Sequence, residues 1–273
     1  MRSETAPAIR LEDYQPPLYR IDKVALNVEL APGATRVTAT LEVSRQPGTQ
    51  VGAPLVLDGD ELSLAGIKLN GEALAETAYA ATADRLELAS PPADPFELTL
   101  VTELDPDANT KLMGLYRSSA TYCTQCEAEG FRRITYFLDR PDVLAVYTTR
   151  LEASKKDCPV LLANGNLTET GDIDGTGRHY AVWHDPHPKP AYLFALVAGD
   201  LAEVPDTFTT MSGKEVALNI YVEHGKESLC DWAMDSLKRS MRWDEEVFGR
   251  EYDLDVFNIV AVSDFNMGAM ENK

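Results

Sequence analysis

The chain is poor in cysteine and histidine, and it has no long apolar segment. Its 273 residues include four cysteines and four histidines. No stretch approaches the roughly 18 consecutive apolar residues that a membrane-spanning helix needs. Residues 1–7 are polar and lack the apolar core of a secretory signal. We therefore expect a protein of the cytoplasm without a membrane span.

Basic residues are scarce relative to acidic ones. Lysine and arginine number 25 against 44 aspartates and glutamates, which gives a net charge of −19. Such a charge repels nucleic acid and anionic lipid, so we expect no nucleic-acid partner. It favours cationic ligands, although keeping the protein soluble would explain the same acidity.

The few cysteines and histidines give little support for a metal or redox site. Cys123 and Cys126 have the spacing of a redox pair or of half a zinc knuckle. No second pair with that spacing exists, and Glu127 and Glu129 would raise the thiol pKa. His179, His184 and His187 form a cluster, but Pro186, Pro188 and Pro190 interrupt that stretch, so these histidines do not share a helix face. His224 is isolated. We expect no metal bound by this chain.

Residues 1–200 read as an all-β domain built from antiparallel sheets. Apolar and polar residues alternate over 24–30 and again over 37–43, on either side of the turn at 31–33. Asn70-Gly71 predicts a tight hairpin. The segments 106–114 and 122–133 show no periodicity and are expected to be loops. The proline-rich stretch 184–190 should lead into a strand at 192–197.

Residues 201–273 read as the beginning of a mixed α/β domain. A hairpin is expected across Ser212-Gly213, followed by a helix over 228–248. Ser228 and Asp231 fit a capping box, and Gly249 fits a helix stop. The β-branched run 255–262 predicts a strand buried on both faces. The fold class is thus mainly β, with a short α/β part at the end.

The last ten residues, 264–273, carry the clearest motif. Gly268 and Ala269 have almost no side chain, so another extended backbone can approach them closely. A carboxylate follows at Glu271, where such an incoming chain would end. We expect residues 268–272 to form a strand or a sheet edge.

Gly268-Ala269-Met270-Glu271-Asn272, with Asn266-Met267 before it and Lys273 after it, resembles the exopeptidase motif of zinc aminopeptidases. The match is to the bacterial aminopeptidase N (alanyl aminopeptidase) family of gluzincins. Two further stretches, 122–136 and 185–200, are similar to the same family, and the resemblance runs from Tyr14 to the end. It implies a saddle-like β domain followed by the first part of a thermolysin-like catalytic domain. It also implies zinc in the full-length protein.

No His-Glu-x-x-His occurs in the sequence, so this chain supplies neither zinc ligands nor a general base. We therefore expect an N-terminal part of an aminopeptidase that is inactive alone, with no catalytic residue of its own. Its predicted partners are peptides with a free N-terminus, and self-association through exposed apolar surface is a further expectation. The alternatives are a non-catalytic peptide-binding or scaffold module and, third, a redox protein.

The resemblance assigns roles to eight residues that would bind substrate. Glu127 and Glu271 would hold the peptide ammonium, and Gln125 and Met267 would line the pocket for the first side chain. Gly268 and Ala269 would pair with the substrate backbone, while Glu129 is expected to be an ordinary surface acid. The full predicted set is Gln125, Glu127, Met267, Gly268, Ala269, Met270, Glu271 and Asn272.

Overall fold

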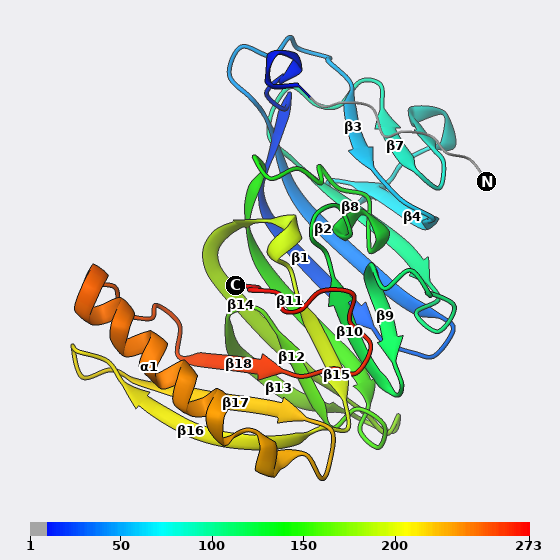
Figure 1. Ribbon diagram of the computed structural model, residues 1–273. Coiled ribbons are helices and arrows are strands. Elements are labelled where there is room, and N and C mark those ends of the chain that lie inside the picture. The colour runs from blue at the N-terminus through cyan, green and yellow to red at the C-terminus, as the bar shows by residue number, and fades with distance from the viewer. Residues whose placement is uncertain (1–9) are drawn as a thin grey trace.

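The computed structural model describes residues 10–273, and most of these residues lie in β-sheets (Figure 1). The predicted mainly β fold class is confirmed. The strands are β1 (Tyr19–Glu29), β2 (Thr35–Arg45), β3 (Leu55–Asp58), β4 (Ser63–Leu69), β5 (Glu72–Ala73), β6 (Tyr79–Ala81), β7 (Arg85–Leu88), β8 (Phe96–Leu104), β9 (Gly114–Ser118), β10 (Thr121–Gln125), β11 (Leu144–Ser154), β12 (Val160–Ala163), β13 (Asn166–Ile173), β14 (Arg178–Pro190), β15 (Leu196–Gly199), β16 (Ala202–Thr209), β17 (Glu215–Val222) and β18 (Val256–Val260).

Helices are few in the described residues. The α-helix is α1 (Asp231–Phe248), and the short 3-10 helices are η1 (Leu11–Asp13), η2 (Glu76–Ala78), η3 (Phe131–Arg133), η4 (Ala191–Leu193) and η5 (Glu227–Leu229). We call β1 to β15 the first unit and β16 to β18 with α1 the second unit. Residues 261–273 are the tail.

An eight-stranded sheet forms the frame of the first unit, in the order β13-β14-β11-β1-β2-β8-β4-β5. The expected alternation is confirmed in β1, where Val24, Leu26 and Val28 are buried and their neighbours are not. The neighbours in this sheet are antiparallel except β1 and β11, which are parallel. The hairpin at Asn70-Gly71 is also confirmed, with positive φ at both residues.

Two smaller sheets complete the first unit, in the orders β3-β7-β6 and β12-β15-β10-β9. The second of them corrects a prediction, because residues 121–125 form strand β10 and not a loop. All five residues of β10 are buried. A strand buried on both faces shows no polar–apolar alternation, so the periodicity gives no signal.

The proline-rich stretch also departs from its prediction. Strand β14 continues through Pro186, Pro188 and Pro190, and the chain then forms η4 before it enters β15. Beyond His184 this strand pairs only with β11, since β13 ends its pairing there. Proline lacks a backbone donor and is tolerated where one side of a strand has no partner.

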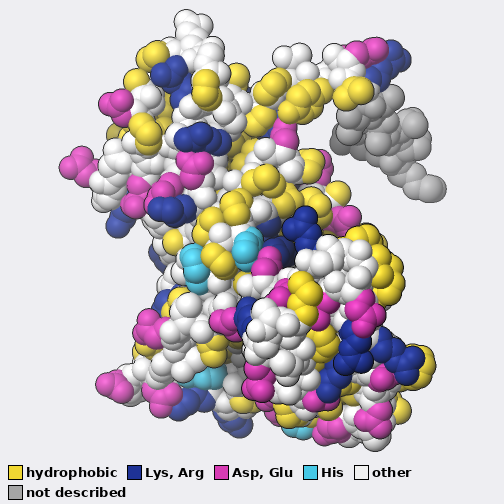
Figure 2. All heavy atoms as spheres, turned by 90° about the vertical axis from the view of Figure 1, so that its left-hand side faces the viewer, with side chains coloured by type: hydrophobic (Ala, Val, Ile, Leu, Met, Phe, Trp, Pro, Cys, Tyr) yellow, Lys and Arg dark blue, Asp and Glu magenta, His cyan; other side chains and the backbone are white. Residues whose placement is uncertain are grey.

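The second unit packs α1 across a three-stranded sheet in the order β16-β17-β18 (Figure 1). Met234, Leu237 and Met241 of α1 join Leu218 and Ile220 of β17 in a separate hydrophobic core. The hairpin at Ser212-Gly213 is confirmed. In Figure 2 hydrophobic, acidic and basic side chains are interspersed on the face that includes this unit.

Three predictions for the second unit and the tail need correction. The helix begins at Asp231 with no side-chain cap, because residues 227–229 form η5; the stop at Gly249 (φ 62°) is confirmed. Strand β18 is only half-buried, because it pairs with β17 alone at the edge of the sheet. Residues 268–272 form no strand.

Candidate peptide-binding site

Gln125 and Glu127 lie at the end of β10 and in the turn immediately after it. Gln125 is 1% exposed and pairs with Gly114 of β9. Its side-chain amide donates to the Glu127 carbonyl (3.4 Å), while its Oε1 is buried without a hydrogen-bond partner. The turn closes where the amide of Gly130 donates to the Cys126 carbonyl (2.8 Å). Glu127 is half-buried, and the turn holds its backbone in place.

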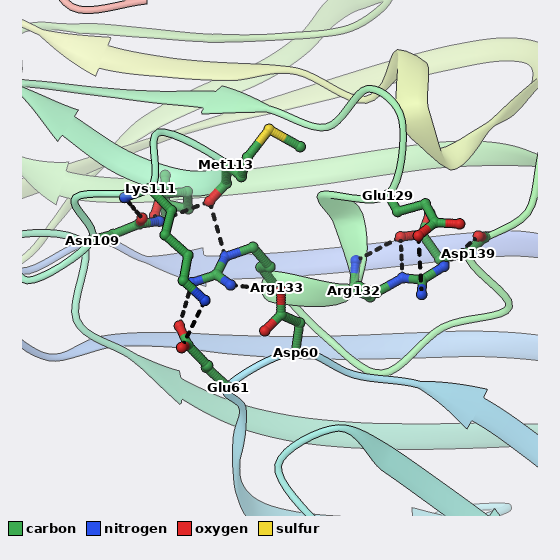
Figure 3. A network of polar contacts seen from close by, with 10 residues as sticks. Asp60, Glu61, Asn109, Lys111, Met113, Glu129, Arg132, Arg133 and Asp139 are labelled. Carbon is green, nitrogen blue, oxygen red and sulfur yellow. Dashed lines mark hydrogen bonds and ion pairs between the residues drawn. The ribbon is translucent and has the colours of Figure 1, made fainter. Parts of the chain in front are cut away.

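Two arginines just beyond the turn fasten it to neighbouring loops (Figure 3). The Arg133 guanidinium donates to Asp60 and Glu61, each at 2.6 Å, and to the Met113 carbonyl at 3.2 Å. The Arg132 Nε donates to Asp139 at 3.0 Å. These contacts border a surface cavity of about 430 Å³ and hold the turn from its C-terminal side.

Glu129 lies on the same turn and pairs with Arg132 at 3.5 Å. Its side chain is 66% exposed, as expected of a surface acid. It therefore offers a natural comparison for Glu127, two residues away.

The tail begins against strand β9. The Ser118 hydroxyl donates to the Asp264 carboxylate (2.9 Å) and accepts from the Asp264 amide (2.9 Å). The Tyr116 hydroxyl donates to the Asp264 carbonyl at 2.9 Å. Two residues further on, the Asn266 side-chain amide donates to the Leu112 carbonyl at 3.1 Å. The tail therefore passes from the Ser118 end of β9 toward the end where Gly114 pairs with Gln125.

The other end of the tail is held by residues of both units. The Lys273 ammonium donates to both Asp253 carboxylate oxygens at 2.8 and 3.1 Å. The Asn164 side chain donates to the carbonyls of Lys273 and Leu193 and accepts from the Ala195 amide. Because Ala195 directly precedes β15, Lys273 lies at the start of the strand that neighbours β10 (Figure 1).

The predicted binding residues of the tail lie between these two attachments. Residues 267–269, 271 and 272 are exposed, and Met270 is half-buried. A Cβ added to Gly268 would meet nothing within 4 Å, so space for another backbone exists there. The Asn272 side-chain amide donates to the Met270 carbonyl at 3.4 Å.

The structure thus places the predicted residues around one end of a single sheet. The convergence of the Glu127 and Glu271 carboxylates on one ligand stays a prediction.

Sequence reasoning missed the side chains that hold the tail, namely Tyr116, Ser118, Asn164 and Asp253. Tyr116 and Ser118 lie 148 and 146 residues from Asp264 in the chain. A contact over such a separation leaves no local pattern in a single sequence.

The histidines and acids do not form a metal centre in the part of the chain that the structure describes. No group of three or more His, Cys, Asp or Glu residues is arranged to hold an ion there. His179 contacts the Cys158 carbonyl (2.7 Å), and His184 contacts the Thr148 hydroxyl (2.9 Å). The residues present therefore do not fit the zinc that the resemblance implies.

The C-x-x-C thiols are buried and free. Burial raises the pKa of Cys123 to about 11 and the pKa of Cys126 well above its usual value. Asp264 and Asp139, and not the adjacent Glu127 and Glu129, add smaller electrostatic contributions to these pKa shifts. Because the thiolate is the reactive form, these cysteines lack the environment of a redox pair.

Comparison with known proteins places the chain in a family. Residues 15–193 match the Peptidase M1 N-terminal domain, and residues 232–273 match the Peptidase family M1 domain. The chain belongs to the peptidase M1 family, and its similar relatives include aminopeptidases.

Individual relatives are close in sequence. The chain is 55% identical to aminopeptidase N of Caulobacter vibrioides over 100% of its length, and 51% identical to aminopeptidase N of Escherichia coli over 96%. It covers 31% and 29% of those proteins, so it spans about a third of their length. No helix of the described residues is long and apolar enough to cross a membrane.

Solved structures agree with this placement. Aminopeptidase A of Legionella pneumophila, crystallised with aspartic acid, superposes with a TM-score of 0.92 at 36% identity, covering 97% of this chain and 31% of that one. An M1 zinc metallopeptidase of Deinococcus radiodurans has a TM-score of 0.73 at 18% identity, covering 89% of this chain and 56% of that one. The second likeness concerns the fold alone.

Proposed function

We propose that this chain provides the substrate-amine and backbone recognition of a zinc aminopeptidase, which removes single residues from peptides with a free N-terminus. One observation carries the proposal. The β9–β10 hairpin holds the start of the tail through Asp264 and also ends in Gln125, two residues before Glu127. One rigid element therefore relates the two halves of the proposed site.

The chemistry of the two carboxylates suits a peptide amine. A free α-amino group has a pKa of about 7.7–8.0 and is mostly an ammonium at neutral pH. Glu127 is half-buried and Glu271 is exposed, and neither has an ion-pair partner among the described residues. Each hydrogen bond to a charged group contributes about 1.5–3 kcal/mol, so two of them would reject a blocked terminus strongly.

The remaining residues of the site would orient the peptide. Gly268 and Ala269 are exposed and free of bulky side chains, so their backbone groups can pair with an extended substrate. Gln125, whose Oε1 is buried without a partner, would meet the first residue of the substrate together with Met267. Met270 and Asn272 would support this segment from within the tail.

Zinc belongs to the proposed full-length enzyme and not to this chain's own residues. A bound zinc ion would polarise the scissile carbonyl. The residues described here would bind and orient the peptide, and the chain alone is proposed to be inactive.

Location, domain division and association are part of the same proposal. Four free, buried cysteines suit the reducing cytoplasm.

A domain boundary at 200/201 is supported by the two hydrophobic cores, which meet near that position. Self-association is proposed through the exposed apolar side chains of α1.

The test replaces each carboxylate in the full-length protein that contains this chain. Glu271→Ala and Glu127→Ala should each lower kcat/KM for an unblocked peptide by about tenfold or more, because a charged hydrogen bond is lost. Zinc content, measured by metal analysis, should stay unchanged. Glu129→Ala is the matched control and should keep near-normal kcat/KM. Full activity in both test variants would refute the amine-binding role.

A further inference from the structure

The geometry points to Ser118 as a positioning residue for the substrate-binding tail, acting through Asp264. We refer to Tyr116, Ser118 and Asp264 as the Asp264 clasp. The inference rests on the proposed function and goes beyond it, because Ser118 itself would touch no substrate. Its task would be to set where residues 267–271 lie relative to Glu127.

The clasp bonds the amide, the carbonyl and one carboxylate oxygen of a single tail residue, Asp264. Ser118 both donates to the Asp264 carboxylate and accepts from its amide, and Tyr116 donates to its carbonyl, all at 2.9 Å. Tyr116 is 0% exposed and Ser118 is 4% exposed. Being two residues apart on a strand, they project from the same face of β9. The attachment point is therefore rigid and specific.

The strand that holds Asp264 is paired along its whole length with the strand that leads to Glu127. Ser118 pairs with Thr121 at one end of the hairpin, and Gly114 pairs with Gln125 at the other. A displacement of the clasp would shift the tail against Gln125 and Glu127. Because binding groups must be held within a fraction of an ångström, this relation would matter for turnover.

Little else restrains the middle of the tail. Met267 is 44% exposed, and Gly268 has open space around its Cα. The other attachments are the Asn266 side chain, which donates to the Leu112 carbonyl, and Lys273, which is bound to Asp253 and Asn164. Loss of the clasp would leave the segment held by these contacts alone, and a smaller fraction of molecules would then hold the binding arrangement.

The first experiment tests the clasp without reference to peptides. Hydrogen exchange of this 273-residue chain is measured for Ser118→Ala and for the matched control Ser44→Ala. Ser44 is 6% exposed and donates to Asp22 at 2.9 Å, so its replacement also removes a part-buried serine–aspartate hydrogen bond. Ser118→Ala should speed exchange of the Asp264 amide, the one amide of residues 264–273 with a hydrogen-bond acceptor among the described residues, by about tenfold or more, whereas Ser44→Ala should not. Unchanged exchange in the tail would overturn the inference.

The second experiment measures kcat/KM in the full-length protein that contains this chain. Ser118→Ala should lower it by about tenfold for an unblocked peptide, and Ser118→Thr, which keeps the hydroxyl, should restore most of it. Ser44→Ala should leave it unchanged. Asp264→Ala serves as a second variant if Ser118→Ala does not fold, since Asp264 lies in an exposed position.

The outcomes separate the two proposals. If Glu271→Ala impairs turnover but Ser118→Ala and Asp264→Ala do not, only the positioning role is wrong. If Glu271→Ala and Glu127→Ala have no effect while Ser118→Ala still speeds exchange in the tail, the clasp stands and the amine-binding role fails.

Discussion

Gly130 decides whether the turn that carries Glu127 can close. A Cβ at this position would lie 2.5 Å from the Gln125 carbonyl oxygen and 2.9 Å from the Cys126 Cα. Both obstructing atoms belong to the backbone, so neither can rotate away as a side chain would. The close approach of residue 130 to the end of β10 therefore requires glycine.

Gly130→Ala should destabilise the chain by about 1–3 kcal/mol, as overpacking in a tight interior does. The free energy of unfolding from urea titration provides the measurement. Gly268→Ala is the control, because its new methyl group would meet no atom within 4 Å and the effect should stay below about 0.5 kcal/mol. Equal stabilities for the two variants would contradict the steric argument.

The candidate site shows what single residues reveal and conceal. Its eight proposed members can be recognised because the motif around Glu271 and the stretch around Glu127 are similar to a known family. The residues that hold the tail, Tyr116 and Ser118, carry no such signal, since no pattern in the sequence predicts strand β9. Their role depends on a partner more than a hundred residues away.

Among the elements, strands with one buried face give a clear sequence pattern, whereas β10 and β14 do not. β1 and β2 alternate, so their pattern gives both their type and the side chains that face the core. β10 is buried throughout and therefore shows no alternation, so its sequence resembles that of a loop. β14 contains three prolines, which are untypical of a strand. The environments that make both strands possible come from partners that lie far away in the sequence.

Glu61 joins three segments of the first unit, and its ionisation should be visible in the acid stability. It lies between β3 and β4 and accepts from Lys111 (2.7 Å) and from Arg133 (2.6 Å) (Figure 3). The Lys111 and Arg133 hydrogen bonds lower its pKa from 4.5 to about 2. Because the folded pKa lies below the unfolded one, this stabilisation is present above about pH 4.5 and is lost as the pH falls toward 2.

Glu61→Gln should therefore destabilise the chain at pH 7, and the difference from the unmodified chain should shrink between pH 4.5 and 2. The side chain is 58% exposed, so solvent screening keeps the effect below about 1 kcal/mol, and added salt should reduce it. Urea unfolding at a series of pH values measures it. Glu72→Gln is the control, because it removes an exposed carboxylate that has no ion pair in residues 10–273. A constant difference for Glu61→Gln down to pH 2 would argue against the assignment.

At the scale of the whole molecule, polar contacts link the two units. The Asp255 amide donates to the Asn166 side chain at 2.8 Å, and His187 lies 3.2 Å from Asp253. Asp253 also binds Lys273, so the same joint holds the end of the tail. The sequence indicates a change from an all-β domain to a mixed α/β domain near residue 200. It does not predict these contacts, because they join residues that lie far apart in the chain.

The outer face of α1 leads to the last prediction, which concerns two copies of the chain. The inner face is occupied by Met234, Leu237 and Met241, yet the helix and its approach also expose large apolar side chains: Leu229 (75%), Trp232 (73%), Trp243 (53%), Val247 (55%) and Phe248 (60%). Exposed large apolar side chains gathered on one element mark a candidate contact surface. The net charge of −19 opposes association, so salt should strengthen it by screening.

Sedimentation velocity over a wide range of protein concentration should therefore show association of the chain that increases with salt. The double variant Trp232→Glu, Phe248→Glu should remove most of it, because two charges would be buried in the contact. Leu11→Glu alters an even more exposed apolar residue far from α1 in the sequence (92% exposed) and should leave the association intact. A sedimentation coefficient that is independent of concentration at high salt, or equal loss in both variants, would show that α1 does not mediate self-association.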